Sequence, residues 1–197
     1  MPLNLSNGGE YTPHIRYMAS TSSWSMSTEN GMQPFTFEQA VFDLENIQTG
    51  WAFFGAEQAP EWVMDQSLSQ MAPKPQDGRE WKRGFKINVY SQKMFGEQQP
   101  VREFATSATG AVMGIDDLYT QYESQKDANA GKLPVVAYKG ATPKKVGKGN
   151  TTVPQLEIIK FVDRPDELKD GVPVPANQSA NQSVQPAQAS SSGTPEF

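Results

Sequence analysis

The sequence has no cysteine and only one histidine, His14. Without cysteine there is no disulfide framework, no thiol nucleophile and no Cys-ligated metal site, a composition that suits a reducing compartment. A single histidine excludes a His-based catalytic triad and a multi-His metal site within one chain, and we expect His14 to be exposed on the surface. The sequence therefore gives no reason to expect a metal or another cofactor.

Long apolar runs are also missing. No stretch approaches the roughly 20 apolar residues that a membrane-spanning helix needs. The N-terminal residues lack the cationic and apolar regions of a signal peptide. We therefore expect no membrane association and a cytoplasmic protein.

Apolar residues are a modest 37% of the 197 residues, and 15 prolines and 16 glycines predict many turns. One folded domain with tails fits this composition. Residues 1–33 are polar and predict a flexible arm, with Trp24 either docked on the domain or stacked on a ligand. Residues 34–165 are expected to form the domain. Residues 166–197 are rich in Pro, Ala, Gln, Asn and Ser and predict a disordered tail.

Hydrophobic alternation predicts five strands. They span residues 35–47, 51–55, 81–95, 133–138 and 153–162, with 101–105 continuing the sheet. The first two are expected to form a hairpin. Apolar residues at i, i+3, i+4 and i+7 predict a helix over 115–126. The connection 56–78 predicts a loop with a helical turn near 62–68, and 139–152 predicts a second loop.

The expected order is three strands, a helix and two strands. This order predicts a mainly β fold, a five-stranded Greek-key barrel with one helix between strands 3 and 4 and flexible tails at both ends. It is the oligonucleotide/oligosaccharide-binding arrangement, the OB-fold. Ligands of such barrels lie across strands 2 and 3, between the loop that joins strands 1 and 2 and the loop that joins strands 4 and 5.

Two segments are strongly basic in a chain of net charge −5. Residues 79–102 hold six cations and two acids, with aromatic residues between the cations. Residues 139–152 hold four lysines and no acid. Cations beside exposed rings suit a polyanion with flat faces, and single-stranded nucleic acid is such a partner. The alternative is an ordinary amphipathic strand and scattered, solvated surface charge.

The hypothesis assigns two roles. Cations would contact phosphates, and rings would stack on bases with weak sequence preference. Tyr90 is the best ring, because its strand parity puts it beside Lys86; for the other rings, core packing is the competing interpretation. The candidate cations are Lys82, Arg83, Lys86, Lys139, Lys144, Lys145 and Lys148. The candidate rings are Tyr90, Trp51, Phe54, Trp62 and Trp81.

The core resembles the OB-fold single-stranded-DNA-binding proteins of bacteriophages and prophages. The resemblance lies in VFDLENIQTGWAFF (41–54), EWKRGFKINVYS (80–91), LPVVAYKGATPKK (133–145) and VPQLEIIKFVDRP (153–165). It implies sequence-independent binding and protection of single-stranded DNA in phage replication or recombination, in the host cytoplasm. In that family an acidic tail with a terminal aromatic recruits replication partners; here residues 171–197 end in Phe197 but hold a single acid, Glu196.

Other functions find less support. Residues 140–149 only approximate a phosphate-binding P-loop, because the glycine spacing is too long and a Gly stands where Ser or Thr would hold magnesium. Asp43, Glu45 and Glu157 have no spacing that marks a metal-dependent nuclease, so we expect no enzyme. The remaining alternative is a β-barrel interaction module, such as a virion or assembly protein, whose basic face binds a protein partner. The sequence leaves homo-oligomerisation open.

Overall fold

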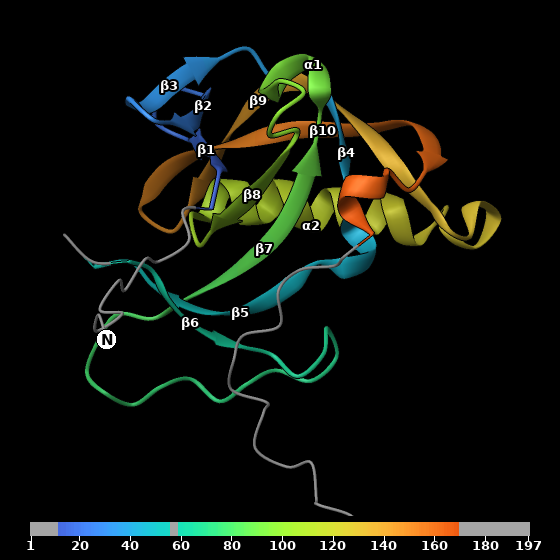
Figure 1. Ribbon diagram of the computed structural model, residues 1–197. Coiled ribbons are helices and arrows are strands. Elements are labelled where there is room, and N and C mark those ends of the chain that lie inside the picture. The colour runs from blue at the N-terminus through green and yellow to red at the C-terminus, as the bar shows by residue number, and fades with distance from the viewer. Residues whose placement is uncertain (1–11, 56–58, 170–197) are drawn as a thin grey trace, which may run out of the picture.

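The computed structural model describes residues 12–55 and 59–169, which form a mainly β structure around one mixed ten-stranded sheet (Figure 1). The strands are β1 (His14–Met18), β2 (Ser23–Thr28), β3 (Gly31–Phe35), β4 (Gln39–Phe42), β5 (Gln48–Phe53), β6 (Glu61–Met64), β7 (Lys82–Tyr90), β8 (Val101–Thr106), β9 (Lys132–Val146) and β10 (Gly149–Asp163). The helices are α1 (Gln92–Phe95), α2 (Thr109–Glu123) and three 3-10 turns, η1 (Leu44–Asn46), η2 (Asp127–Asn129) and η3 (Asp166–Leu168).

Strand pairing follows the order β10-β9-β4-β7-β8-β1-β2-β3, and β5 pairs with β7 and β6. Among the described pairs, β1 and β8 are parallel and the others antiparallel. This pairing does not close the sheet. Side chains bridge the gap instead, since the Tyr17 and Thr152 hydroxyls lie 2.9 Å apart and the Tyr138 hydroxyl donates to the Ser22 carbonyl at 3.2 Å.

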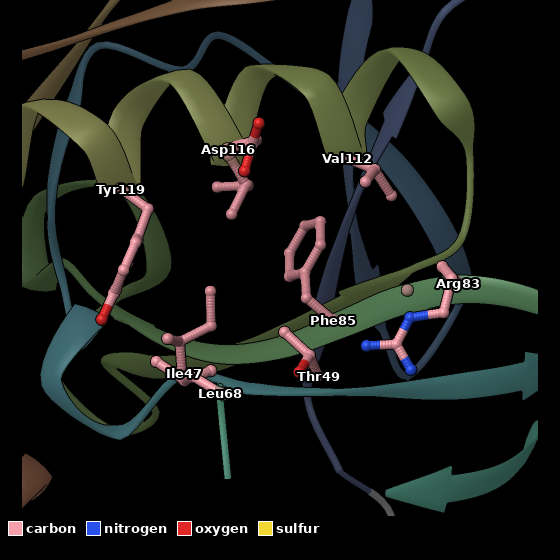
Figure 2. Close-up of a pocket in the computed structure, with 10 residues that line it drawn as sticks. Ile47, Thr49, Leu68, Arg83, Phe85, Val112, Asp116 and Tyr119 are labelled. Carbon is pink, nitrogen blue, oxygen red and sulfur yellow. The ribbon is translucent and has the colours of Figure 1, made fainter. Parts of the chain in front are cut away.

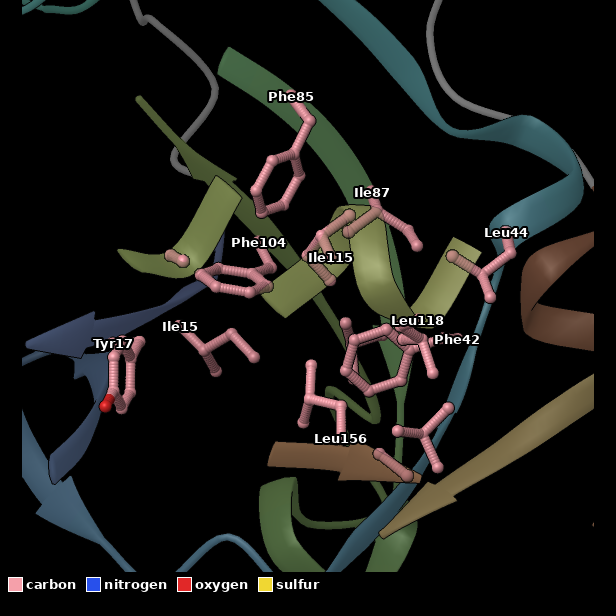
Figure 3. Close-up of a cluster of buried hydrophobic side chains, with 14 of the residues drawn as sticks. Ile15, Tyr17, Phe42, Leu44, Phe85, Ile87, Phe104, Ile115, Leu118 and Leu156 are labelled. Carbon is pink, nitrogen blue, oxygen red and sulfur yellow. The ribbon is translucent and has the colours of Figure 1, made fainter. Parts of the chain in front are cut away.

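The main core lies between the sheet and α2. Figure 3 shows Phe85 and Phe104 from the sheet and Ile115 and Leu118 from α2 around one interior, where each is at most 3% exposed. The inward residues of β7 alternate along the strand, as their sequence period requires. The expected apolar stripe of the helix is confirmed.

Helix α2 begins six residues earlier than the stripe predicts, at Thr109. Its first turns pack directly on β10. A Cβ on Gly110 would lie 2.1 Å from the Thr152 carbonyl oxygen, and one on Gly114 2.8 Å from that of Pro154. The small residues that weaken helix propensity here are therefore what allows the helix to approach the strand.

The prediction of a flexible arm over residues 1–33 is wrong for the described part, because residues 14–28 form β1 and β2. Ile15 and Tyr17 point inward from β1, and Trp24 is 2% exposed against Tyr17, Phe37 and Phe104. Trp24 therefore docks in the core and does not face a ligand. Both strands are short, and β2 (SWSMST) is rich in Ser, so its alternation was masked by polar residues.

Other boundaries also differ from expectation. The predicted first strand breaks at η1, where the buried Asp43 accepts hydrogen bonds from Asn46 at 2.9 Å and Arg164 at 3.0 Å. As a result β5 pairs with β6 and β7, and not with β4. Residues 61–64 form strand β6 where a helical turn was expected. The lysine loop predicted over 139–152 is instead mostly strand, because β9 continues to Val146 and β10 begins at Gly149.

The structure has more strands and helices than the expected five-stranded barrel with one helix. At the C-terminal end, η3 orders the start of the predicted tail, because Leu168 is 2% exposed in a cluster with Val41 and Leu133. The rest of that tail, with Phe197, lies outside the described residues. No helix in the described ranges is long and apolar enough to cross a membrane.

Candidate nucleic-acid interface

A groove of about 760 Å³ runs over the outer faces of β7, β8 and β1. Strand alternation creates its floor, since Lys82 and Lys86 point outward from β7 while Phe85 and Ile87 point into the core. The groove is lined by Thr12, His14, Ile15, Arg16, Phe54, Ala59, Pro60, Trp62, Lys82, Lys86, Glu103, Ala105, Thr106, Ser107 and Ala108.

Two aromatic rings form one wall of the groove. Trp62 and Phe54 lie edge to face, with ring centroids 5.9 Å apart, and Phe54 is 47% exposed. The residue beneath Trp62 is Gly84, where a Cβ would lie 3.1 Å from Cη2 of the indole and 2.5 Å from the Thr106 carbonyl oxygen. A side chain at this position would collide with the indole and with the backbone of β8, so glycine lets Trp62 pack against β7 as an aromatic platform in the groove.

Cations lie next to this platform. The Lys86 ammonium lies 5.1 Å from the centroid of the Trp62 ring and 3.9 Å from the Glu103 carboxylate. Lys82 lies 3.3 Å from Glu80, in a pair whose side chains are both more than half exposed. Such exposed ion pairs contribute little and exchange readily with another anion. The groove therefore combines cationic side chains with an aromatic ring, the two kinds of group that non-specific single-strand sites use.

Arg16 and His14 belong to the groove although sequence reasoning did not select them. They reach it because β1 pairs in parallel with β8, where His14 lies opposite Glu103. The signal was the alternation in HIRYM, which puts Ile15 and Tyr17 inward and His14 and Arg16 outward. His14, which was expected on the surface, is thus one of the residues that line the groove.

Arg83 and Trp51 point to the opposite face of the sheet, away from the groove. The Arg83 guanidinium pairs with Asp65 and lies 5.2 Å from the Trp51 ring centroid. The Trp51 indole N–H donates to the Ala72 carbonyl at 2.8 Å. Both residues therefore hold the 65–81 connection against β5 and β7, which corrects their assignment to phosphate contact and base stacking.

Trp81 is also excluded from base stacking in this conformation. It is 4% exposed, its indole N–H donates to Asp77 at 2.9 Å, and the Arg79 guanidinium lies 4.9 Å from its ring centroid. The competing interpretation, core packing, holds for this ring. Trp81 lies four residues before Phe85, so the two share the inward strand parity, which agrees with this result.

Asp65 anchors the same connection. Its carboxylate accepts from Arg83 at 2.9 Å, from the Thr49 hydroxyl at 2.5 Å and from the Ala72 backbone N–H at 2.8 Å. The Arg83 hydrogen bond, supported by those from Thr49 and Ala72, lowers the pKa of Asp65 from its ordinary 3.8 to about 2, against the opposing effect of burial. Asp65 is therefore a structural carboxylate that stays ionised at neutral pH.

Tyr90 has the predicted parity but not the predicted surroundings. It is half-buried against the cluster that contains Leu168. Burial raises its pKa, and so do the nearby carboxylates of Glu167 and Asp166. A ring covered by η3 and next to acids is a poor base platform, and Tyr90 is absent from the groove lining.

The four hairpin lysines do not line the groove either. Lys139 lies 3.5 Å from Glu157 within the β9–β10 hairpin. Lys144, Lys145 and Lys148 lie near its turn and are exposed. The hairpin is tied to the loop between β1 and β2, where Thr152 donates to the Ala19 carbonyl at 2.5 Å. These lysines thus lie on the β9–β10 hairpin and outside the groove lining.

A second cavity, of about 240 Å³, lies between α2 and the inner face of β5 and β7 (Figure 2). Its walls are mainly apolar, with Ile47, Phe85 and Val112 among them. Arg83 borders it but is engaged by Asp65. The cavity therefore offers no available cation for a phosphate and is not part of the candidate interface.

In residues 12–55 and 59–169, no group of three or more His, Asp or Glu side chains could hold a metal ion. Comparisons with protein-family models, with curated proteins and with solved structures find no match to this chain.

Proposed function

We propose that the chain binds single-stranded DNA in the groove over β7, β8 and β1, with weak sequence preference and without enzymatic activity. The observation that carries this proposal is the Trp62 ring, seated on Gly84 with the Lys86 ammonium 5.1 Å from its centroid. Stacking on such a ring is typically worth about 1–3 kcal/mol per base and suits any base. Arg16 and Lys82 add phosphate-binding charge in the same groove.

The strand order supports an OB-like plan as part of this proposal. If β4 and β5 together form the first strand, then β7 and β8 are the second and third, α2 follows the third, and β9 and β10 are the fourth and fifth. The pairings β4–β9, β7–β8 and β9–β10 fit such a plan. The groove then lies on strands 2 and 3, where OB-folds bind their ligands. Residues 14–35 would be an addition, with β1 next to β8.

Replication or recombination of phage DNA is the biological setting that we propose for this activity. It rests on the family resemblance of the sequence. Contact of the C-terminal tail with replication or recombination proteins belongs to the same proposal. If the groove instead binds a protein, the chain is the interaction module named above.

A titration with oligo-dT at low salt tests the proposal. We expect quenching of tryptophan fluorescence, loss of that quenching in Trp62→Phe, and weaker binding of a duplex of equal length. Three groove cations, Arg16, Lys82 and Lys86, predict a log–log salt slope of about −2 on single strands. Unchanged fluorescence and mobility at low salt would show that single-stranded DNA is not the ligand.

A further inference from the structure

One carboxylate lies among the cations of the groove. Glu103, on β8, is opposite Asn88 of β7 and His14 of β1, and its side chain is 25% exposed. Its contact with Lys86, at 3.9 Å, is too long for a hydrogen bond. Within the described part of the chain, both carboxylate oxygens thus keep acceptor capacity that faces the groove.

This carboxylate repels phosphate, so it does not serve the polyanion backbone. An ionised carboxylate only accepts hydrogen bonds. It is complementary to a base edge that presents an amino group, such as N4 of cytosine, and it repels the O4 carbonyl of thymine or uracil. Glu103 can therefore distinguish bases that a stacking ring treats alike.

The position of Glu103 fits such a role. Lys86 contacts both Glu103, at 3.9 Å, and the Trp62 ring, at 5.1 Å from its centroid. Glu103 lies on the floor of the same groove, so a base stacked on Trp62 would have one edge toward Glu103. We propose that Glu103 reads this edge and gives the groove a preference for amino-bearing bases, cytosine above all, over thymine and uracil. This inference rests on the proposed function.

The test compares oligo-dC with oligo-dU at pH 8 and fixed salt, because these two strands differ only at the pyrimidine edge. A single edge contact predicts roughly fivefold tighter binding of oligo-dC to the unmodified chain. In Glu103→Gln the ratio should fall to about one, because an amide both donates and accepts. The matched control is Glu123→Gln on α2, which removes the same charge at an exposed site beside Lys126 and should keep the ratio.

The outcomes separate the inference from the proposed function. Equal affinity of the unmodified chain for both strands would overturn the inference and leave single-strand binding intact, and this comparison needs no variant. A Glu103→Gln variant that binds both strands more tightly by the same factor would overturn it too, because Glu103 would then act by charge alone. Failure of both strands to bind would defeat the proposed function and the inference together.

Discussion

Lys86 connects the two chemistries of the groove, since it contacts the Trp62 ring and the Glu103 carboxylate from one position on β7. Its outward direction followed from strand alternation in the sequence, as did the inward direction of Phe85, Ile87 and Val89. The same alternation puts Trp81 inward with Phe85, but it did not assign Trp51 and Trp62. The 65–81 connection holds Trp51 and Trp81 on one face of the sheet, whereas Trp62 lines the groove on the other face.

Lys86→Ala should weaken binding of single-stranded DNA. The variant loses a cation of the groove and breaks the ion pair with Glu103, so we expect a loss of about 1 kcal/mol, or about fivefold in Kd. Fluorescence anisotropy of a labelled oligo-dT measures the change. Lys126→Ala, which breaks only the exposed pair with Glu123, is the control and should bind as the unmodified chain does. Equal loss in both variants would indicate that only net charge matters.

Asp65 predicts an acid-sensitive component of stability. Its pKa is about 2 in the folded chain against an ordinary 3.8, so the unfolded chain takes up the proton first as pH falls. The stabilisation, about 2 kcal/mol, is fully present above pH 3.8 and is lost as pH falls from there toward 2.

Chemical denaturation at several pH values measures this effect. Asp65→Asn should lower the free energy of unfolding at pH 7, and the gap to the unmodified chain should narrow below pH 4. Asp117→Asn, at an exposed position of α2, should leave the acid profile unchanged. A constant gap from pH 7 to pH 2 would contradict the role of the ionised Asp65.

At the scale of elements, the β9–β10 hairpin carries a second group of lysines. Its lysines 144, 145 and 148 are exposed and lie outside the groove lining. A strand that only fills the groove would not touch them, whereas a longer strand has length to continue onto the hairpin. Their contribution should therefore depend on the length of the oligonucleotide.

The double variant Lys144→Glu/Lys145→Glu tests this length dependence. Binding of an oligo-dT of about 20 nucleotides should weaken severalfold, and binding of one of about 6 nucleotides should change much less. The same comparison with oligo-dA should give the same losses, because phosphate contacts ignore base identity. An equal loss for both lengths would place the hairpin lysines next to the groove, and no loss for either would remove them from the interface.

The elements that sequence reasoning missed share a physical cause. Strands β1 and β2 are short, β2 is rich in Ser, and β1 gains its place from a parallel pairing with β8 that no local pattern encodes. The early turns of α2 contain Gly110 and Gly114, whose value lies in close packing on β10 and not in helix propensity. Arg16 and Glu103 were missed because each becomes a groove residue only through the neighbours that the sheet gives it.

At the scale of the whole molecule, a chain of net charge −5 can bind a polyanion only through a local concentration of cations. The mainly β class, β7 and the buried stripe of α2 were predictable, because each depends on a periodic apolar pattern. The path of the sheet was not, since the break at η1 depends on Asp43, Asn46 and Arg164, which lie up to 121 residues apart. That break turns β5 away from β4 and builds the wall that carries Trp62.

The central claim is that a single strand lies in the groove over β7, β8 and β1. Photo-cross-linking with an oligonucleotide that carries 5-iodo-deoxyuridine, followed by peptide mapping, tests it most directly. We predict cross-links in the peptides that contain Trp62 and Phe54, lost in the presence of excess unlabelled strand. Cross-links confined to the peptides of Tyr90 and η3, or to the 65–81 connection, would contradict the claim.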